Sequence, residues 1–247
     1  MTTAMIVEGV TKRFKLSNST GLKSLTVNAV KGRRSVKTFT AVDNVSFQLD
    51  IGGSIGLMGL NGSGKSTLLK LISGVMEPTA GKVLTRGRIA GLIEIGAGFH
   101  PDLTGRENIF LNGAILGMSQ AEIRRKYDEI LAFSEMENFV ESSVRNYSSG
   151  MFMRLAFAVA VHTDCDIFLM DEMLAVGDQP FRRKCVKKIY ELKDQGKTMV
   201  YVSHNTNQVV KLCELGMVLS AGQVQFFGQA SEAVNTLGYD FEDEEDD

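Results

Sequence analysis

The stretch of sequence that decides the fold is Gly59-Leu60-Asn61-Gly62-Ser63-Gly64-Lys65-Ser66-Thr67. It fits the pattern G-x-x-x-x-G-K-[ST], follows the apolar run Ser54–Met58 and precedes a segment with helical spacing, Ser66–Ile72. Glycines let backbone N–H groups turn toward an anion, and the start of a helix adds partial positive charge. We therefore predict a phosphate-binding loop, against the alternative of a chance glycine-rich turn.

The side chains of this loop have distinct predicted tasks. Lys65 would reach the β- and γ-phosphates of a nucleotide, and the Ser66 hydroxyl would ligate Mg²⁺. The predicted phosphate contacts come from Asn61, Gly62, Ser63, Gly64, Lys65, Ser66 and Thr67.

A second buried run, Ile167–Met170, ends in the acid pair Asp171-Glu172. A carboxylate at the end of a strand can hold Mg²⁺ through water, and we assign this role to Asp171. Glu172 would polarise an attacking water as a general base. The alternative is an exposed acid pair that follows a strand.

Strand and helix patterns alternate along the chain. Met5–Val10 alternates weakly and suggests an edge strand, Phe39–Leu49 a half-buried strand, and Thr198–Val202 another strand. Thr104–Val140 is mainly helical, and Phe181–Leu192 is a further helix. This order predicts an α/β fold with a largely parallel sheet and helices on its faces.

The capping-box spacing of Ser119 and Glu122 marks a helix start within the helical part. Behind it, apolar residues recur on one helical face. They are Ile123, Tyr127, Ile130 and Leu131. A second helix, Phe152–Val161, is strongly apolar.

Composition excludes several classes. The 247 residues are 44% hydrophobic, enough for a substantial core, and no apolar run is long enough for a membrane span. The start of the chain does not have the pattern of a secretory signal, and three scattered cysteines indicate reduced thiols rather than a metal cluster. The acidic segment 240–247 is predicted to be a disordered tail, and the basic segment 17–38 an insertion.

Further motifs bring the chain close to a known family. Tyr147–Met151 (YSSGM) precedes the apolar helix, Asp178 follows the acid pair, and His204 follows the strand Thr198–Val202. With the phosphate loop, these motifs resemble those of the ATP-binding cassette ATPases. The resemblance covers about Met5 to Phe227.

The resemblance implies a P-loop, RecA-like core with N-terminal antiparallel β elements and a helical subdomain at about residues 100–160, within one ATPase domain spanning 1–239. It also implies that ATP and Mg²⁺ are bound between two copies arranged head to tail. The phosphate loop of one copy would face Ser148, Ser149 and Gly150 of the other. Asp178 would lie at the same interface, and His204 would contact the γ-phosphate.

The sequence departs from the usual family pattern at several points. Ser149 and Met151 replace a glycine and a glutamine, and Met173-Leu174 replaces a proline-threonine pair. The usual glutamine ligand of the metal is missing, and Glu94 is the nearest equivalent.

In these departures, and in the runs 97–101 and 103–108, the sequence resembles one branch of the family, the ATPases of ABC-2 type polysaccharide exporters. That branch implies a membrane permease partner, a lipid-linked polysaccharide substrate, no nucleic acid, and a place at the cytoplasmic face of the membrane. The alternatives are a drug or lipid exporter, a mechanical ATPase or a small-molecule kinase.

Two assignments stay open. Phe14 matches the family position that stacks on adenine, with Phe39 as its competitor. The basic insertion would attract the diphosphate of a lipid carrier, or would simply be a solvated loop. His100 and His162 have no metal-ligand spacing and are expected to be structural or surface residues.

Overall fold

The computed structural model describes residues 2–16, 37–93, 96–171 and 177–237. Most of the basic insertion, the acidic segment 240–247, Glu94 and Glu172 lie outside these residues. The predictions that rest on them therefore remain predictions.

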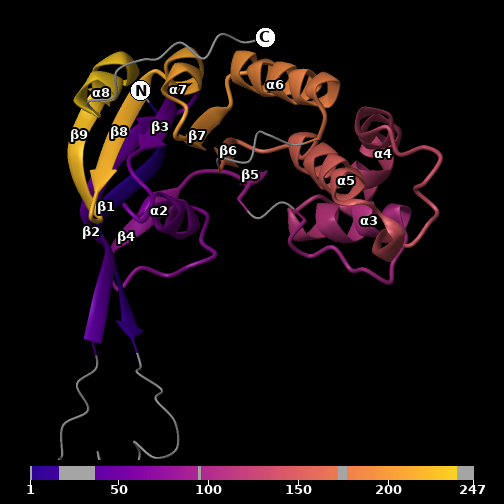
Figure 1. Ribbon diagram of the computed structural model, residues 1–247, viewed down its shortest axis with the longest axis horizontal. Coiled ribbons are helices and arrows are strands. Elements are labelled where there is room, and N and C mark those ends of the chain that lie inside the picture. The colour runs from indigo at the N-terminus through magenta and orange to yellow at the C-terminus, as the bar shows by residue number, and fades with distance from the viewer. Residues whose placement is uncertain (1, 17–36, 94–95, 172–176, 238–247) are drawn as a thin grey trace, which may run out of the picture.

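The strands form two sheets (Figure 1), which share a hydrophobic core. The three-stranded sheet contains β2 (Lys37–Asp50), β1 (Thr3–Leu16) and β4 (Ala80–Thr85), in that order. The six-stranded sheet contains β5 (Ile89–Leu92), β6 (Ile167–Met170), β7 (Thr198–Val202), β3 (Ser54–Met58), β8 (Leu215–Ser220) and β9 (Gln223–Gln229), in that order.

The six-stranded sheet is parallel from β5 to β8, and only its edge strand β9 is antiparallel. The three-stranded sheet is antiparallel throughout. Both observations confirm the predicted α/β fold with N-terminal antiparallel elements.

The prediction that Met5–Val10 is an edge strand is wrong. β1 is the central strand of its sheet and pairs with both β2 and β4. The second partner could not be foreseen, because most residues of β4 are exposed and its sequence has no apolar alternation.

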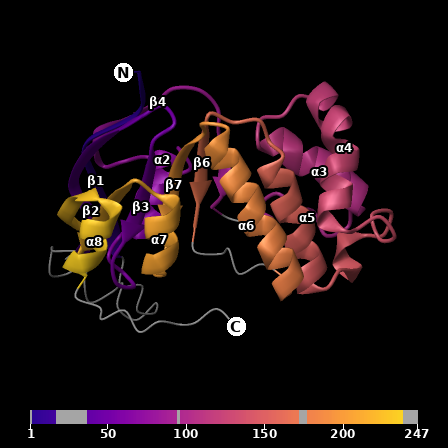
Figure 2. The ribbon, with the colours of Figure 1, turned by 90° about the horizontal axis from the view of Figure 1, so that it is seen from above.

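The helices fall into two groups (Figures 1 and 2). One group packs on the six-stranded sheet: α2 (Lys65–Ile72), α6 (Gln179–Asp194), α7 (Thr206–Leu212) and α8 (Ala230–Thr236). The other lies to one side of the sheet, with α5 also packed against it: α3 (Gly105–Ile115), α4 (Gln120–Ser134), the 3₁₀ turn η1 (Val144–Asn146) and α5 (Ser149–Val161). Among the described residues, no helix is both long enough and apolar enough to span a membrane.

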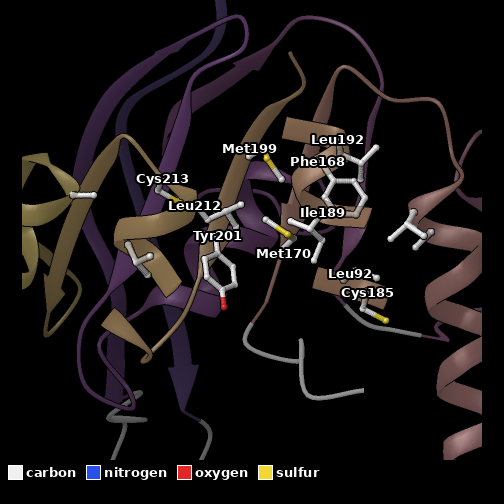
Figure 3. Packing of buried hydrophobic residues seen from close by; sticks show 14 of the residues in the cluster. Leu92, Phe168, Met170, Cys185, Ile189, Leu192, Met199, Tyr201, Leu212 and Cys213 are labelled. Atoms are coloured by element: carbon white, nitrogen blue, oxygen red, sulfur yellow. The ribbon is translucent and has the colours of Figure 1, made fainter. Parts of the chain in front are cut away.

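The central strands read as continuous apolar runs because both of their faces are buried. Phe168 and Met170 of β6 point toward the core shared with α5, α6 and α7 (Figure 3), while Ile167 and Leu169 enter the core beneath α2 and the small sheet. Tyr201 of β7 is fully buried on the same side as Phe168. Packing on both faces fixes the position of each strand, and therefore the position of the site residues that follow its end.

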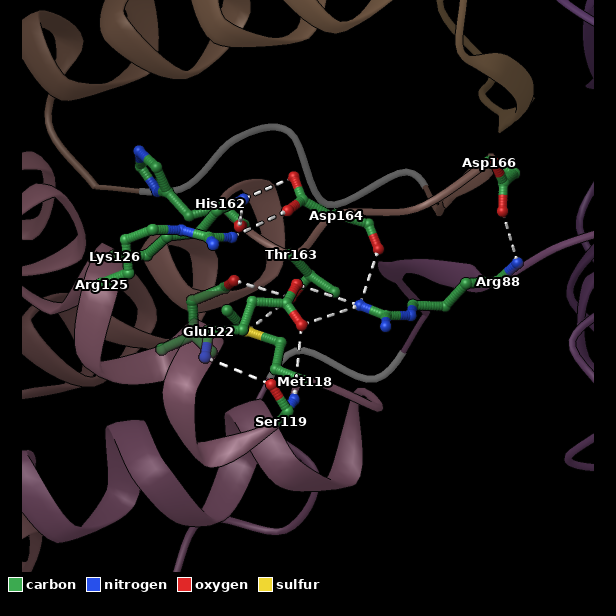
Figure 4. Close-up of polar contacts among 11 residues, drawn as sticks. Arg88, Met118, Ser119, Glu122, Arg125, Lys126, His162, Thr163, Asp164 and Asp166 are labelled. Atoms are coloured by element: carbon green, nitrogen blue, oxygen red, sulfur yellow. Dashed lines mark hydrogen bonds and ion pairs between the residues drawn. The ribbon is translucent and has the colours of Figure 1, made fainter.

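A polar network joins the helical group to the sheet (Figure 4). Arg88, just before β5, bonds both oxygens of Glu122 on α4 at 3.0 and 3.2 Å and the carbonyl of Asp164 at 3.0 Å. Lys126 of α4 bonds the Asp164 carboxylate at 2.5 Å and the carbonyl of His162 at 2.7 Å. The network lies at the amino ends of β5 and β6, opposite the edge that carries the phosphate loop.

Both halves of the predicted capping box form, because Ser119 and Glu122 each bond the backbone N–H of the other. Glu122 therefore serves the cap and the Arg88 contact together. The helix predicted at Phe152–Val161 begins three residues earlier, because Ser148 caps it by accepting a bond from the Met151 N–H. His162 is buried against the carbonyl of Ala158, as expected of a structural histidine.

Candidate functional site

The phosphate loop connects the fully buried β3 to α2 and can be built only with glycine at two of its positions. Gly59 and Gly64 have φ of 137° and 108°. A Cβ at Gly59 would lie 2.1 Å from the carbonyl oxygen of Leu219, and one at Gly64 would lie 2.4 Å from that of Ala41. The backbones of β2 and β8 therefore pack so closely against the loop that no residue larger than glycine fits at these two positions.

Ser63 carries a polar atom that the fold does not satisfy. Its hydroxyl is buried and has no hydrogen-bond partner among the described residues. A buried hydroxyl without a partner costs on the order of 1–3 kcal/mol, so an acceptor from outside the chain is the natural complement. The loop therefore fits the phosphates predicted to bind there.

Lys65 is buried over the loop, and its ammonium donates to the carbonyls of Gly59 at 2.7 Å and Leu60 at 3.0 Å. Burial lowers the pKa of Lys65, and the charge of Asp171 opposes that shift. The pKa of Asp171 is raised, again chiefly by burial, with Lys65 and Lys70 opposing. A lysine and a carboxylate that feel each other's charge thus lie at the carboxyl edge of the sheet.

Two of the three residues predicted to bind Mg²⁺, Asp171 and Ser66, are described by the structure and carry oxygen atoms that suit the ion. Asp171 follows β6, two strands from β3, and the exposed Ser66 lies in the first turn of α2. A carboxylate and a hydroxyl oxygen are ligands that Mg²⁺ accepts together with nucleotide oxygens. The third predicted ligand, Glu94, lies outside the described residues, as does the predicted base Glu172.

His204 lies where the sequence predicts, after β7, which pairs in parallel with β3. It is exposed and borders a pocket of about 520 Å³ that also contains three residues at the start of the phosphate loop. The pocket is lined by Met58, Gly59, Leu60, Asn61, Ser203, His204, Thr206 and Leu237. The structure therefore brings His204 and the loop together at one cavity.

The two candidates for adenine stacking turn out to be direct neighbours. Phe14 of β1 pairs with Phe39 of β2, so both side chains lie on the same face of the ribbon that projects in Figure 1. Phe14 is half-buried with the Lys12 ammonium 5.5 Å from its ring, and Phe39 is exposed. The carbonyl of Ala41, two residues after Phe39, lies beside Gly64 of the phosphate loop. Because Phe14 and Phe39 are paired across the ribbon, this contact does not favour one ring over the other, and the choice between them stays open.

The signature segment, Tyr147–Met151, forms a second and separate surface. Ser148, Ser149 and Gly150 line a pocket of about 650 Å³ that has no lining residue in common with the His204 pocket. Asp178 lines it too, from the start of α6. The first turn of α5 contains no acidic residue, so its amide groups can face an anion.

Gly150 is a glycine that the fold itself does not require. Its φ lies outside the left-handed region, and a Cβ there would meet its nearest neighbour, Ser148 Oγ, at 3.9 Å. Every other described glycine either has a positive φ or would bring a Cβ to 3.0 Å or less from a neighbouring atom. The fold therefore leaves the space beside Gly150 open.

Sequence reasoning missed Arg154. This residue is the sole charge in the apolar helix α5, and its guanidinium bonds Asp178 at 2.8 Å and Glu135 at 2.5 Å. A single charge within an otherwise apolar helix is a signal that the sequence did contain.

Residues 42–175 match the ABC transporter family. The O-antigen export system ATP-binding protein RfbB of Myxococcus xanthus is 46% identical over 236 residues, which cover 93% of this chain and 54% of that protein. The chain thus spans about half the length of this relative. The protein of the same name from Klebsiella pneumoniae is 39% identical, with 91% of this chain and 93% of that protein covered.

A teichoic acids export ATP-binding protein, TagH of Bacillus anthracis, is 42% identical over 92% of this chain and 41% of its own length. Among solved structures, an ATP-binding cassette in a dimeric post-hydrolysis state, bound to ADP and Pi, is 25% identical. It superimposes with a TM-score of 0.72 and covers 92% of this chain and 98% of that one. With the phosphate loop and the signature segment in their places, these likenesses show that the chain belongs to the ABC transporter family.

Proposed function

We propose that this chain is an ATPase subunit that drives the export of a lipid-linked polysaccharide through a membrane permease. The observation that carries the ATPase proposal is the pair of incomplete surfaces. The phosphate loop holds a buried hydroxyl, at Ser63, for which the described part of the chain supplies no partner, and the signature segment holds an open space at Gly150. The names of the O-antigen and teichoic acid relatives support the substrate class.

The two surfaces belong to different pockets, so one nucleotide is completed by two copies of the chain. Lys65 and the loop amides of one copy hold the phosphates, and Ser148 and Gly150 of the other copy close over the γ-phosphate. The dimeric cassette bound to ADP and Pi supports this arrangement. We propose a homodimer that closes on ATP and opens once the phosphate is cleaved.

In this proposed site each residue of the chain has a separate role in hydrolysis. Glu172 accepts a proton from the attacking water, and Lys65 and His204 stabilise charge on the γ-phosphoryl group as ADP and phosphate form. Asp171 and Ser66 would hold Mg²⁺, which supplies further charge neutralisation. The aromatic pair Phe14 and Phe39 offers a ring for adenine.

A second groove suits the permease partner. A mostly apolar pocket of about 380 Å³ lies between β5, the end of α3 and the small-residue face of α5, Ala156 and Ala160. Ile115 and Val75 on its border are 57% and 71% exposed. We propose that a short apolar helix from the cytoplasmic side of the permease fills it, which places this chain at the cytoplasmic face of the membrane.

The described end of the basic insertion adds to this proposal. Lys37 and its cross-strand partners lie at the tip of the β1–β2 ribbon, where bases Arg13 and Lys15 are exposed and none of the described residues nearby on the two strands is acidic. We retain the proposal that this region attracts the diphosphate of the lipid carrier, with a solvated loop as the alternative outcome. Neutralising Lys31, Arg33, Arg34 and Lys37 together would then weaken export but not basal hydrolysis.

The deciding experiment uses the full chain with its permease in proteoliposomes. Lys65→Ala is expected to abolish ATP hydrolysis and export, because Lys65 is the main fixed charge on the phosphates. Ile115→Asp is expected to preserve ATP binding while it prevents co-purification with the permease. Wild-type turnover by Lys65→Ala would refute the ATPase site, and full export by Ile115→Asp would refute the groove.

A further inference from the structure

The end of α4 and the beginning of α6 meet at Arg154 of α5. Its guanidinium donates to Glu135 Oε2 at 2.5 Å through one nitrogen and to Asp178 Oδ1 at 2.8 Å through another. Its plane also lies over the ring of Phe181, 4.8 Å from the centroid. The Arg154 side chain is only 20% exposed, so the contacts form at the inner side of the signature pocket rather than in open solvent.

Each partner has a defined place in the backbone. Glu135 terminates α4 in the left-handed conformation, with φ of 60°, and also receives the ammonium of Lys184 from α6 at 3.3 Å. Asp178 is the N-cap of α6 and accepts the N–H of Phe181 at 3.2 Å. Arg154 therefore ties the end of α4 and the beginning of α6 to the helix whose first turn carries the signature segment.

The charges make this connection directional. Glu135 and Asp178 both contact one guanidinium, so their carboxylates are held closer together than two negative charges would otherwise remain. Without Arg154, repulsion would push Asp178 away from α4 and from the signature segment. The planar fork of an arginine directs separate N–H groups at the two carboxylates in a fixed geometry, which the single ammonium of a lysine does not provide.

The same residues border the surface on which the partner's nucleotide is proposed to sit. Ser148, Gly150, Arg154, Asp178 and Glu135 all line the signature pocket. A displacement of Asp178 would therefore change the part of the pocket that meets the other copy. It would leave the phosphate loop, which lines a different pocket, unchanged.

We propose that Arg154 is a positioning residue that holds Asp178 and the signature serine as one rigid unit for the partner's ATP. The proposal rests on the two-copy site described above. It predicts that loss of Arg154 impairs the closed dimer and turnover, while ATP binding to a single subunit stays intact.

The test compares Arg154→Met and Arg154→Lys with a matched control, Arg106→Met. Arg106 also pairs with a glutamate, Glu141, and also lies over a ring, that of Tyr127, within the same group of helices. It does not line the signature pocket. The full chain is assayed for ATP affinity as a dilute monomer, for ATP-dependent dimerisation in a Glu172→Gln background, and for kcat and the Hill coefficient.

For Arg154→Met we expect kcat to fall by about tenfold or more and dimerisation to weaken in proportion, with monomer ATP affinity within twofold of wild type. Arg154→Lys should recover part of the loss, and Arg106→Met should turn over at close to the wild-type rate. An equal loss in Arg106→Met and Arg154→Met would overturn the proposal, as would a loss explained wholly by weaker monomer binding.

A double-mutant cycle guards against simple misfolding. Asp178→Asn keeps an oxygen that can cap α6 but loses the charge that Arg154 holds. If Arg154 acts through Asp178, the double variant Arg154→Met with Asp178→Asn should lose less than the product of the two single losses. Multiplicative losses would refute the coupling. If the wild type does not hydrolyse ATP and the Glu172→Gln variant with Arg154 intact does not dimerise, the proposed function fails instead.

Discussion

Gly150→Ala separates the demands of the fold from those of the site. Gly150 is the second residue of α5, its φ suits any residue, and a methyl group there would have its nearest neighbour at 3.9 Å. Glycine in a helix costs about 0.5–1 kcal/mol relative to alanine. We therefore expect the free energy of unfolding of the isolated subunit to rise by up to this amount. For a domain of this size the melting temperature should rise by about 1–4 °C.

Activity should change in the opposite direction. In the proposed closed dimer the added methyl group would occupy the space that we assign to the γ-phosphate of the partner's ATP and keep that phosphate from the amides of α5. Loss of a preorganised anion contact typically costs on the order of 10²–10³-fold in kcat. ATP affinity of the dilute monomer should not change, because the phosphate loop is untouched.

The assay pairs thermal unfolding without nucleotide with steady-state ATP hydrolysis. Ser231→Ala is the matched control, since Ser231 is the second residue of α8, exposed, and absent from the signature pocket. It should raise stability slightly and leave turnover unchanged. A Gly150→Ala variant that is less stable than wild type, or that hydrolyses ATP at the wild-type rate, would show that the open space has no role in the site.

Three further predictions concern single groups. Glu172→Gln should slow hydrolysis about 10²–10⁴-fold, the usual contribution of a general base, yet accumulate ATP-bound dimers in size-exclusion chromatography. His204→Ala should sharply reduce turnover while ADP affinity, measured by calorimetry, changes little; full-rate turnover would return His204 to a surface role. The pKa of Asp164 is lowered, first by its hydrogen bond to Lys126, so its stabilising effect is present above the unfolded pKa and disappears as pH falls through the folded pKa. Asp164→Asn should therefore unfold more easily than wild type at neutral pH, with the difference vanishing in urea titrations at acidic pH.

The central strands could be predicted because burial on both faces makes them apolar without interruption. Ile167–Met170 and Thr198–Val202 have the bounds expected from the sequence. The small sheet was harder, because β4 is held by pairing with β1 rather than by its own buried side chains. The sequence of a single segment does not show such pairing, and for this reason the alternation of Met5–Val10 predicts an edge strand where β1 is central.

The candidate site divides in the same way. The phosphate loop could be predicted because backbone geometry alone demands its glycines at Gly59 and Gly64. The link from Arg154 to Glu135 could not, since 19 residues of chain separate them and only the packing of α4 on α5 brings them together. The predicted helix start was late for a related reason, because the cap by Ser148 lies before the apolar face begins.

One helix joins the two surfaces on which the proposed function depends. The first turn of α5 carries the signature segment, and its last turns present Ala156 and Ala160 to the apolar groove. A helix of 13 residues is about 20 Å long and behaves as a nearly rigid rod. A rotation that brings Gly150 onto a partner's nucleotide must therefore move the floor of the groove as well. Arg154 ties α4 and α6 to the same helix, and the small side chains of Ala156 and Ala160 leave room in the groove for the proposed permease helix. If the proposed function holds, α5 would therefore couple nucleotide contact to permease contact through one continuous helix.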